Sequence, residues 1–338
     1  MSTSNHITPP RTEIIETALR IWFFHDHRPG HLKQLQGLAM RLQAHAHIEA
    51  IWLDIAEYRL GFRHMLSLPE ALKTLPKPDM IVGAGHQTHI SVLLAAYHLK
   101  AFSALIMKPS LPLRWFDAII CPEHDQVPAS ANILSTVGPL NSVTPPSQIE
   151  QQRARNEHLI LIGGPSKHFR FNDATLLTQI QQLCQETPEV HWTLSNSPRT
   201  PKDFLPQIAL LKLPNLSIHD YTQDLPAPLD HLLTQSRFAW LTADSMSMIF
   251  EALTAGTRAG LFEHTAQAGK QRSRIVKQVQ ALQGRRKVLA FPERSDMFDK
   301  TENQAEPLWE TDRAARWLLE RYAKISRDKK CVIRKTAP

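Results

Sequence analysis

One helix start holds the residue types best suited to chemistry. Asp244 and Ser245, both good N-cap residues, stand between a short apolar run and a helical pattern that ends at Gly256. Exposed N–H groups at such a start favour an anion such as a diphosphate. Ser247 and Glu251 share the polar side of the helix, so Glu251 can accept hydrogen bonds from a ribose. The alternative is an ordinary capped helix of an α/β protein.

Two further turns in the second half of the chain offer groups for a phosphate. Gly163 and Gly164 follow a strand pattern, with Ser166 close behind, and adjacent glycines let backbone N–H groups approach a phosphate. The turn is not a Walker A motif. Arg199 follows the next strand pattern and supplies a forked donor suited to a diphosphate. Together with the helix start, these groups would neutralise a leaving nucleoside diphosphate without a metal.

A turn rich in histidine follows the first strand pattern. Asp26, His27 and His31 are candidates for a general base, because histidine titrates near neutral pH and an aspartate can orient it. Gly30 is the only glycine in this turn, so the dinucleotide fingerprint G-x-G-x-x-G is absent. His27 and His31 are four residues apart and could ligate a metal, but no further ligands are evident and we expect none. A polar, histidine-rich loop is the alternative.

Other strand patterns of the first half also end in polar side chains. The carboxyl ends of parallel strands meet at one edge of a doubly wound sheet, so we expect these side chains near Asp26. Together with Gly30, the secondary candidates are His86, Lys108, Glu123, His124 and Asp125.

Short apolar strands alternate with helical patterns, which predicts parallel sheets flanked by helices. We expect strands at 21–24, 80–82, 103–107, 118–121, 133–134, 158–162, 190–194, 238–242 and 259–262. We expect helices near 32–42, 87–99, 173–185, 245–255, 270–282 and 310–323.

This alternation is interrupted by a proline-rich linker, so we expect two Rossmann-like, doubly wound α/β domains that face a cleft. The expected units are an acceptor domain at 1–140, a linker at 141–157, a nucleotide-sugar domain at 158–308, and a helix with a basic tail at 309–338 that packs back on the first domain.

The composition is that of a globular protein, with 42% hydrophobic and 21% charged residues. The three cysteines are far apart without C-x-x-C spacing, which argues against a disulfide framework and a cysteine zinc site. No apolar run reaches membrane-spanning length, and no signal peptide is evident. We therefore expect a cytoplasmic protein, which could sit on the inner face of the cytoplasmic membrane.

The net charge of +7 favours anionic partners. No nucleic-acid-binding signature accompanies it, so nucleic acid is not expected. Two segments could touch an anionic membrane weakly. One is 58–68, which mixes arginines with large apolar residues near the expected acceptor entrance, although a packed helix is the alternative. The other is the basic tail 321–335, whose alternative is a solvated end.

Five sequence blocks, spread over about residues 20–265, resemble the Elm-type mitochondrial fission protein family. They are Arg28-Pro-Gly-His-x-x-Gln34, Pro122-Glu-His-Asp125, Gly163-Gly-Pro-Ser166, Ser197-Pro-Arg-Thr-Pro201 and Thr242-Ala-Asp-Ser-x-Ser-Met-Ile-x-Glu-Ala252. The resemblance implies a GT-B-like glycosyltransferase fold with the acceptor on the first domain and the nucleotide-sugar donor on the second. The last block is also similar to the donor helix of lipid-linked N-acetylglucosaminyltransferases, which implies that Glu251 binds the ribose.

The leading hypothesis is a metal-independent, inverting glycosyltransferase with no cofactor. It would move a sugar from a nucleotide sugar to a glycan or glycolipid acceptor of the cell envelope, such as a lipopolysaccharide-type glycan. Asp26 ranks first as the general base, because a carboxylate stays ionised at neutral pH, and His27 ranks second. His31 could instead hold the acceptor. The alternatives are a non-catalytic adaptor that keeps the fold, and a nucleotide-sugar epimerase or hydrolase. The absence of G-x-G-x-x-G and of a Tyr-x-x-x-Lys pair argues against the epimerase.

Overall fold

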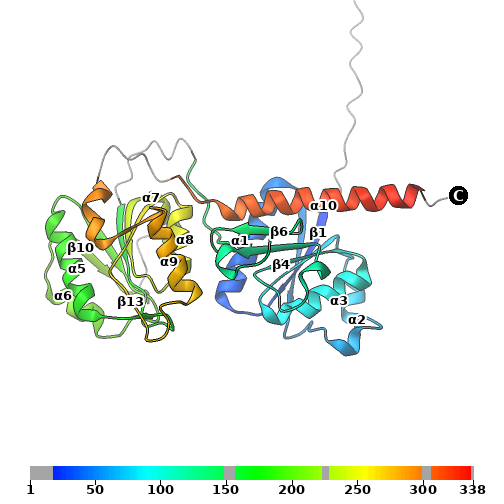
Figure 1. Cartoon of the computed structure of the whole chain (residues 1–338), viewed down its shortest axis with the longest axis horizontal. Helices are drawn as coiled ribbons and strands as arrows, with labels where there is room; N and C mark the ends of the chain where they lie inside the picture. The colour runs from blue at the N-terminus through cyan, green and yellow to red at the C-terminus, as the bar shows by residue number, and fades with distance from the viewer. Residues whose placement is uncertain (1–17, 148–156, 223–227, 299–305, 336–338) are drawn as a thin grey trace, which may run out of the picture.

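The chain forms two parallel sheets, each flanked by helices (Figure 1). The computed structural model describes residues 18–147, 157–222, 228–298 and 306–335. Residues 148–156 of the expected linker lie outside this part of the chain, as do residues 1–17. The side chains of the basic tail at Arg327, Lys329, Lys330 and Arg334 are outside it as well.

The first sheet has six strands in the order β2-β1-β3-β4-β5-β6, all parallel. They are β1 (Leu19–His25), β2 (Ile48–Asp54), β3 (Met80–Ala84), β4 (Phe102–Ile106), β5 (Ala118–Pro122) and β6 (Ile133–Thr136). Ile21 of β1 pairs with Ala50 on one side and Met80 on the other. The strand order reverses between β1 and β3, so a ligand crevice is expected at the carboxyl ends of these two strands.

Three helices and four 3₁₀ turns lie between β1 and β6 in the chain. They are α1 (Pro29–His45), α2 (Glu70–Lys73), α3 (His89–Leu99), η1 (Phe62–His64), η2 (His86–Thr88), η3 (Leu113–Trp115) and η4 (Glu123–Asp125). Helix α1 begins with a proline at its first position, where no N–H partner is needed. Leu35, Leu38 and Leu42 are fully buried along one side of α1, as their helical spacing predicts.

The second sheet is also parallel, with the order β10-β9-β7-β11-β12-β14. Its strands are β7 (Glu157–Leu161), β9 (Trp192–Ser195), β10 (Leu216–His219), β11 (Ser236–Leu241), β12 (Arg258–Leu261) and β14 (Val288–Ala290), and a separate antiparallel pair is formed by β8 (Phe169–Arg170) and β13 (Thr265–Ala266). Around them lie α5 (Asp173–Glu186), α6 (Phe204–Leu210), α7 (Leu229–Gln235), α8 (Met246–Thr254), α9 (Arg274–Gly284) and η5 (Phe291–Phe298). The order reverses between β7 and β11. The predicted fold class of two Rossmann-like, doubly wound domains is therefore confirmed.

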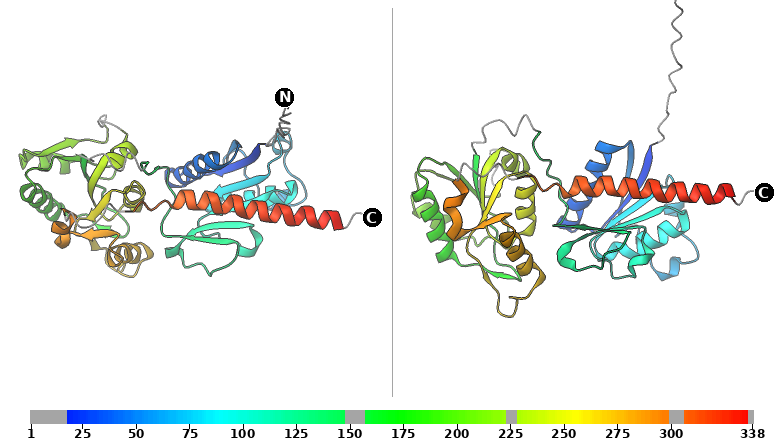
Figure 2. Two further views of the ribbon diagram at one scale, coloured as in Figure 1. Left: turned by 90° about the horizontal axis from the view of Figure 1, so that it is seen from above. Right: turned by 45° about the horizontal axis from the view of Figure 1, so that its top comes forward.

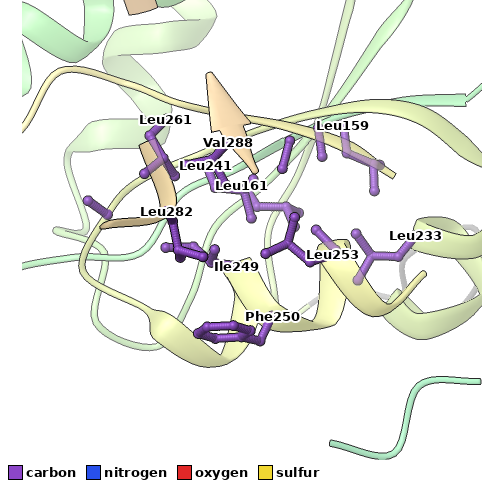
Figure 3. Close-up of a cluster of buried hydrophobic side chains, with 14 of the residues drawn as sticks. Leu159, Leu161, Leu233, Leu241, Ile249, Phe250, Leu253, Leu261, Leu282 and Val288 are labelled. Atoms are coloured by element: carbon purple, nitrogen blue, oxygen red, sulfur yellow. The ribbon is translucent and has the colours of Figure 1, made fainter. Parts of the chain in front are cut away.

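Helix α8 is fixed to the second sheet by its apolar side (Figure 3). Ile249 is 0% and Leu253 4% exposed, and both pack in a cluster that includes Leu161 and Leu241 of the central strands. Burying a side chain of this size contributes roughly 1.5–3 kcal/mol. The opposite side of α8 is thereby turned away from the sheet.

The long helix α10 (Glu310–Lys335) lies along the first sheet, although it follows the second in sequence (Figure 2). It contacts α1, β5 and β6, and buries Ala314, Ala315 and Leu318 completely. Near its start, the Thr311 hydroxyl donates to the carbonyl of Asn141 at 2.8 Å and accepts from its N–H at 3.0 Å. The two segments that connect the domains are therefore hydrogen-bonded to each other.

The alternative of a packed helix at 58–68 is wrong. This segment contains only the short η1 turn, and Gly61 before it is fully extended. An extended glycine stops a helix from continuing through the segment. As a result Phe62 is 79% and Leu66 96% exposed, whereas Leu60 is buried.

Candidate active site

The turn after β7 and the turn after β11 meet at the switch point of the second sheet. The Gly163 N–H donates to the Thr242 hydroxyl oxygen at 2.7 Å, and the Gly164 N–H donates to the Asp244 carboxylate at 3.1 Å. The same carboxylate accepts from the Thr242 hydroxyl at 2.6 Å and pairs with the Arg199 guanidinium at 2.7 Å. Four predicted donor-site residues are thus gathered in one network.

This network uses groups that were predicted from the sequence to bind a phosphate. Both glycine N–H groups have protein acceptors, and the Asp244 side chain is 4% exposed. An added Cβ at Gly163 would overlap the Asp244 carboxylate, and one at Gly164 would overlap the Arg199 carbonyl. The two glycines therefore permit a close approach of protein groups. The predicted Ser166 hydroxyl accepts from the N–H groups of its own loop at His168 and Phe169.

The start of α8 differs from the glycine turn in having backbone N–H groups without a hydrogen-bond acceptor among the described residues. Its N-cap is Ser245, whose side chain forms no capping hydrogen bond, and the Asp244 carboxylate is turned to Gly164 instead. In the described part of the chain, the N–H groups of Met246, Ser247 and Met248 donate no hydrogen bond. Ser247 is exposed. A helix start of this kind attracts an anion through its N–H groups and its dipole.

Glu251 projects from the far side of α8 toward the first domain. Lys33 of α1 places its Nζ 2.6 Å from Glu251 Oε1, and the Glu251 side chain is 4% exposed against 44% for Lys33. The predicted polar side of α8 is therefore covered at Glu251. It is also covered at Thr254, which meets the connecting segments, accepting from Asn141 at 2.9 Å and donating to the Leu308 carbonyl at 3.0 Å.

In the first domain, Asp26 and His31 form a pair at the end of β1. His31 Nδ1 lies 2.9 and 3.0 Å from the two Asp26 oxygens, and the Arg28 N–H donates to Asp26 at 3.3 Å. Gly85, at the end of β3, has a φ of +89°, and a Cβ there would overlap the His31 ring. The Asp26 side chain is 1% exposed, so it is placed to orient the imidazole rather than to reach a substrate.

His27 lies apart from that pair. Its Nε2 contacts the carboxylate of Asp54 at the end of β2, and its backbone is left-handed with a φ of +58°. His25, His27 and Asp54 each offer one ligand atom, all within 4.8 Å of one another, and Nδ1 of His25 is buried without a hydrogen-bond partner. These three residues could hold a divalent ion, which is a different grouping from the His27 and His31 pair that spacing suggests.

The secondary candidates divide between two places. Gly30, exposed at the start of α1, accepts from the Gln34 side chain at 3.1 Å. His86 is exposed beside the Asp26–His31 pair, and its ring lies 5.7 Å from that of His89. His89 is 2% exposed, and burial, together with the neighbouring His86 and His31, lowers its pKa to about 4.

The remaining secondary candidates follow β4 and β5, and two of those after β5 reach helix α9 of the second domain. Glu123 pairs with Arg285 at 3.1 Å, and Asp125 pairs with Arg274 at 3.2 Å. Lys108 lies beside them, donating to the Asp125 carbonyl at 3.4 Å. Burial lowers the pKa of His124, Arg274 lowers it further, and the carboxylate of Asp125 opposes both.

Sequence reasoning missed several residues at this site. Lys33 stands inside the Arg28-Pro-Gly-His-x-x-Gln34 block, and it is the only lysine of α1. Thr242 begins the last block, yet only its contacts with Gly163 and Asp244 give it a role. A helix was expected near 270–282, but nothing local showed that the basic residues of α9 face the first domain.

The chain belongs to the family described as Mitochondrial fission ELM1, which it matches over residues 29–322. A relative from Rickettsia prowazekii (strain Madrid E), named Uncharacterized protein RP120, is 27% identical over 300 residues, covering 72% of this chain and 83% of the relative. The family resemblance of the five sequence blocks is confirmed.

Solved structures share the GT-B-like fold. One, described as "putative UDP-N-acetylglucosamine 2-epimerase" from Listeria monocytogenes, has a TM-score of 0.55 at 11% identity, covering 90% of this chain and 95% of its own. MurG of Acinetobacter baumannii has a TM-score of 0.48 at 15% identity, covering 89% and 91%. At such low identity, the similarity to the Listeria structure shows a shared fold and nothing more. Among the described residues, no helix is both long and apolar enough to cross a membrane.

Proposed function

We propose that this member of the family is a glycosyltransferase that takes a sugar from a nucleotide sugar. The observation that carries the proposal is the position of α1 against α8. His31 and Lys33 both stand in the first two turns of α1, and Lys33 contacts Glu251 of α8. A buried carboxylate suited to a ribose and a histidine suited to a proton transfer are therefore presented by facing helices.

The diphosphate of the donor would bind at the start of α8, where the N–H groups have no protein acceptor. Arg199 is half exposed beside this start, but Asp244 offsets its charge. The Lys33 ammonium can supply the positive charge that Arg199 loses to Asp244. When ribose hydroxyls take the Glu251 carboxylate, the Lys33 ammonium is released close to the diphosphate. Charge balance then comes from the helix start, Arg199 and Lys33, without a metal.

His31 is the group we assign as general base, with Asp26 as its positioning residue. Asp26 accepts from His31 Nδ1, which leaves Nε2 to take the proton of the acceptor hydroxyl as the bond from the sugar to the phosphate breaks. The electrons of that bond pass to the diphosphate. This assignment changes the ranking made from sequence, because Asp26 is buried beneath His31 and His27 is turned to Asp54.

A non-catalytic adaptor is the second candidate, and one observation favours it. The glycine turn and Glu251 are both occupied by side chains of the protein itself, Asp244 and Lys33. An adaptor could keep such contacts permanently, whereas an enzyme must exchange the Lys33 contact for its substrate.

A thermal-shift screen with UDP, GDP, ADP and CMP tests the proposal. Several solved structures of this fold are described as bound to UDP or UDP-GlcNAc, so UDP is the first nucleotide to try. A raised Tm with one nucleotide and not the others is expected of the enzyme. Incubation with the matching nucleotide sugar then separates transferase from epimerase or hydrolase, since the latter two convert the donor without an acceptor. No shift with any nucleotide supports the adaptor.

A further inference from the structure

A pocket of about 400 Å³ lies between the two domains. The first domain contributes η4 with Glu123 and His124, and the connecting segment contributes Val137. The second domain contributes α9 and the loop before it. Its volume falls within the range of roughly 300–1,000 Å³ that is usual for small-molecule sites.

The lining is strongly basic. Arg272, Arg274, Lys277 and Arg285 all line the pocket. Arg274 and Arg285 are paired with carboxylates of the first domain, as described above. Arg272 and Lys277 are exposed and have no ion-pair partner in the described part of the chain. Two uncompensated cations at one pocket favour a ligand group with about two negative charges, such as a phosphate monoester.

The pocket also holds polar atoms that lack a partner. Gln278 is 7% exposed and lines the pocket; its Nε2 donates to the Val137 carbonyl at 3.0 Å, whereas its Oε1 is buried and accepts nothing. Nδ1 of the pocket-lining His124 is buried without a partner as well. A buried acceptor such as Gln278 Oε1 requires a donor, and a ligand hydroxyl group supplies one.

We propose that this pocket binds a phosphorylated sugar unit of the acceptor, with its phosphate on Arg272 and Lys277 and a sugar hydroxyl on Gln278. The proposal rests on the proposed function only in calling this ligand the acceptor. Both domains line the pocket, where η4 of the first domain is ion-paired with α9 of the second.

Binding of glucosamine 1-phosphate, measured by isothermal titration calorimetry on the full chain, tests the pocket. The double variant Arg272→Gln/Lys277→Gln is expected to weaken binding about tenfold to a hundredfold, because hydrogen bonds to a charged group are lost. The control is Lys100→Gln/Lys212→Gln, which removes two exposed lysines that precede strands and so lie at the opposite sheet edges. It is expected to bind as the wild type does.

Two comparisons test the sugar part. Gln278→Met, which keeps the side-chain length, should weaken binding of glucosamine 1-phosphate but not of inorganic phosphate. Glucosamine alone should bind far more weakly than its phosphate. The proposal is overturned if inorganic phosphate binds the wild type as tightly as glucosamine 1-phosphate does. It is also overturned if the Arg272→Gln/Lys277→Gln variant keeps full affinity for glucosamine 1-phosphate.

A second titration, with detergent micelles of a phosphorylated disaccharide glycolipid, identifies the source of the phosphate. Loss of micelle binding in the same double variant supports a lipid-linked acceptor, and binding of the soluble compound alone supports a free sugar phosphate. UDP titrated into the same samples keeps the two proposals apart. If the protein binds the sugar phosphate but no nucleotide, the pocket proposal stands and the transferase proposal fails. If it binds the nucleotide but no sugar phosphate, only the pocket proposal fails.

Discussion

The Nζ atom of Lys33 and the Oε1 atom of Glu251 are 2.6 Å apart, although 218 positions separate the two residues in the chain. The pair joins the first helix of one domain to the central helix of the other. The carboxylate is almost wholly buried and the ammonium is half exposed. A ligand that approaches Glu251 must therefore displace a cation rather than water.

Glu251→Ala is expected to weaken nucleotide binding about tenfold to a hundredfold, since a hydrogen bond to a charged group contributes roughly 1.5–3 kcal/mol. The loss should be equal for the nucleoside mono- and diphosphate, because both carry the ribose. Calorimetric titration of both ligands measures it. Equal affinity of wild type and a folded variant would remove Glu251 from the donor site.

Lys33→Met separates the two partners of this pair. If released Lys33 meets the diphosphate, the variant should lose affinity for the diphosphate and keep most of it for the monophosphate. A variant that binds both ligands more tightly would instead show that Lys33 only competes for Glu251. Circular dichroism and the Tm of each variant serve as the control for folding.

His31→Ala should lower kcat by about 10²–10⁴ with donor affinity nearly unchanged, as expected for loss of a general base. Asp26→Asn should also lower kcat and change the pH profile, because an amide cannot hold the imidazolium as a carboxylate does. His27→Ala is the matched control and should retain activity, since His27 contacts Asp54. Normal turnover in His31→Ala would place the base elsewhere.

The exposed loop around η1 is expected to contact an anionic membrane. Phe62 is 79%, Met65 57% and Leu66 96% exposed, with Arg59 and Arg63 in the same segment. Flotation with anionic vesicles at low salt should recover the wild-type chain and recover Phe62→Ser/Leu66→Ser poorly. Leu210→Ser, at a leucine 76% exposed on α6, is the control. Equal recovery of all three proteins argues against this loop.

Burial of His89 should make the first domain less stable in acid. The pKa of His89 is lowered from 6.5 to about 4, so between these values the unfolded chain binds more protons than the folded one. Stability therefore falls as the pH drops through this window, by at most about 3 kcal/mol for this group. Urea unfolding of His89→Asn at several pH values should show a shallower fall than the wild type. The exposed control His231→Asn should not, and parallel curves for all three proteins would contradict the assignment.

Local patterns in the sequence predict most elements of this fold but not all. The central strands were visible as apolar runs because both of their faces are buried. Strands β2 and β10 were missed because exposed or half-exposed residues such as Glu49 and Ser217 break the apolar run. Strand β14 was missed because its apolar run is only three residues long. Helix α8 could be predicted from its cap and its spacing, both of which are local.

The contacts of the site residues could not be predicted from local sequence patterns. Asp244 has the right type for an N-cap, but its carboxylate binds Gly164, 80 positions away. Asp26 has the right charge for a base, but the fold places His31 above it and leaves it 1% exposed. In both cases the residues were identified by type and position, whereas their roles depend on contacts made only after the sheet has formed.

The hydrogen-bonded pair of connecting segments limits how the two domains can move. Asn141 and Thr311 hold the segments together, and Val137 donates to the Glu310 carboxylate at 2.8 Å beside them. Two connecting segments that are hydrogen-bonded side by side allow the domains to rotate about one axis and resist rotation about the other. Swinging open would part Lys33 from Glu251 and Arg274 from Asp125 together, so entry of a nucleotide and entry of a second ligand would be coupled through a single movement.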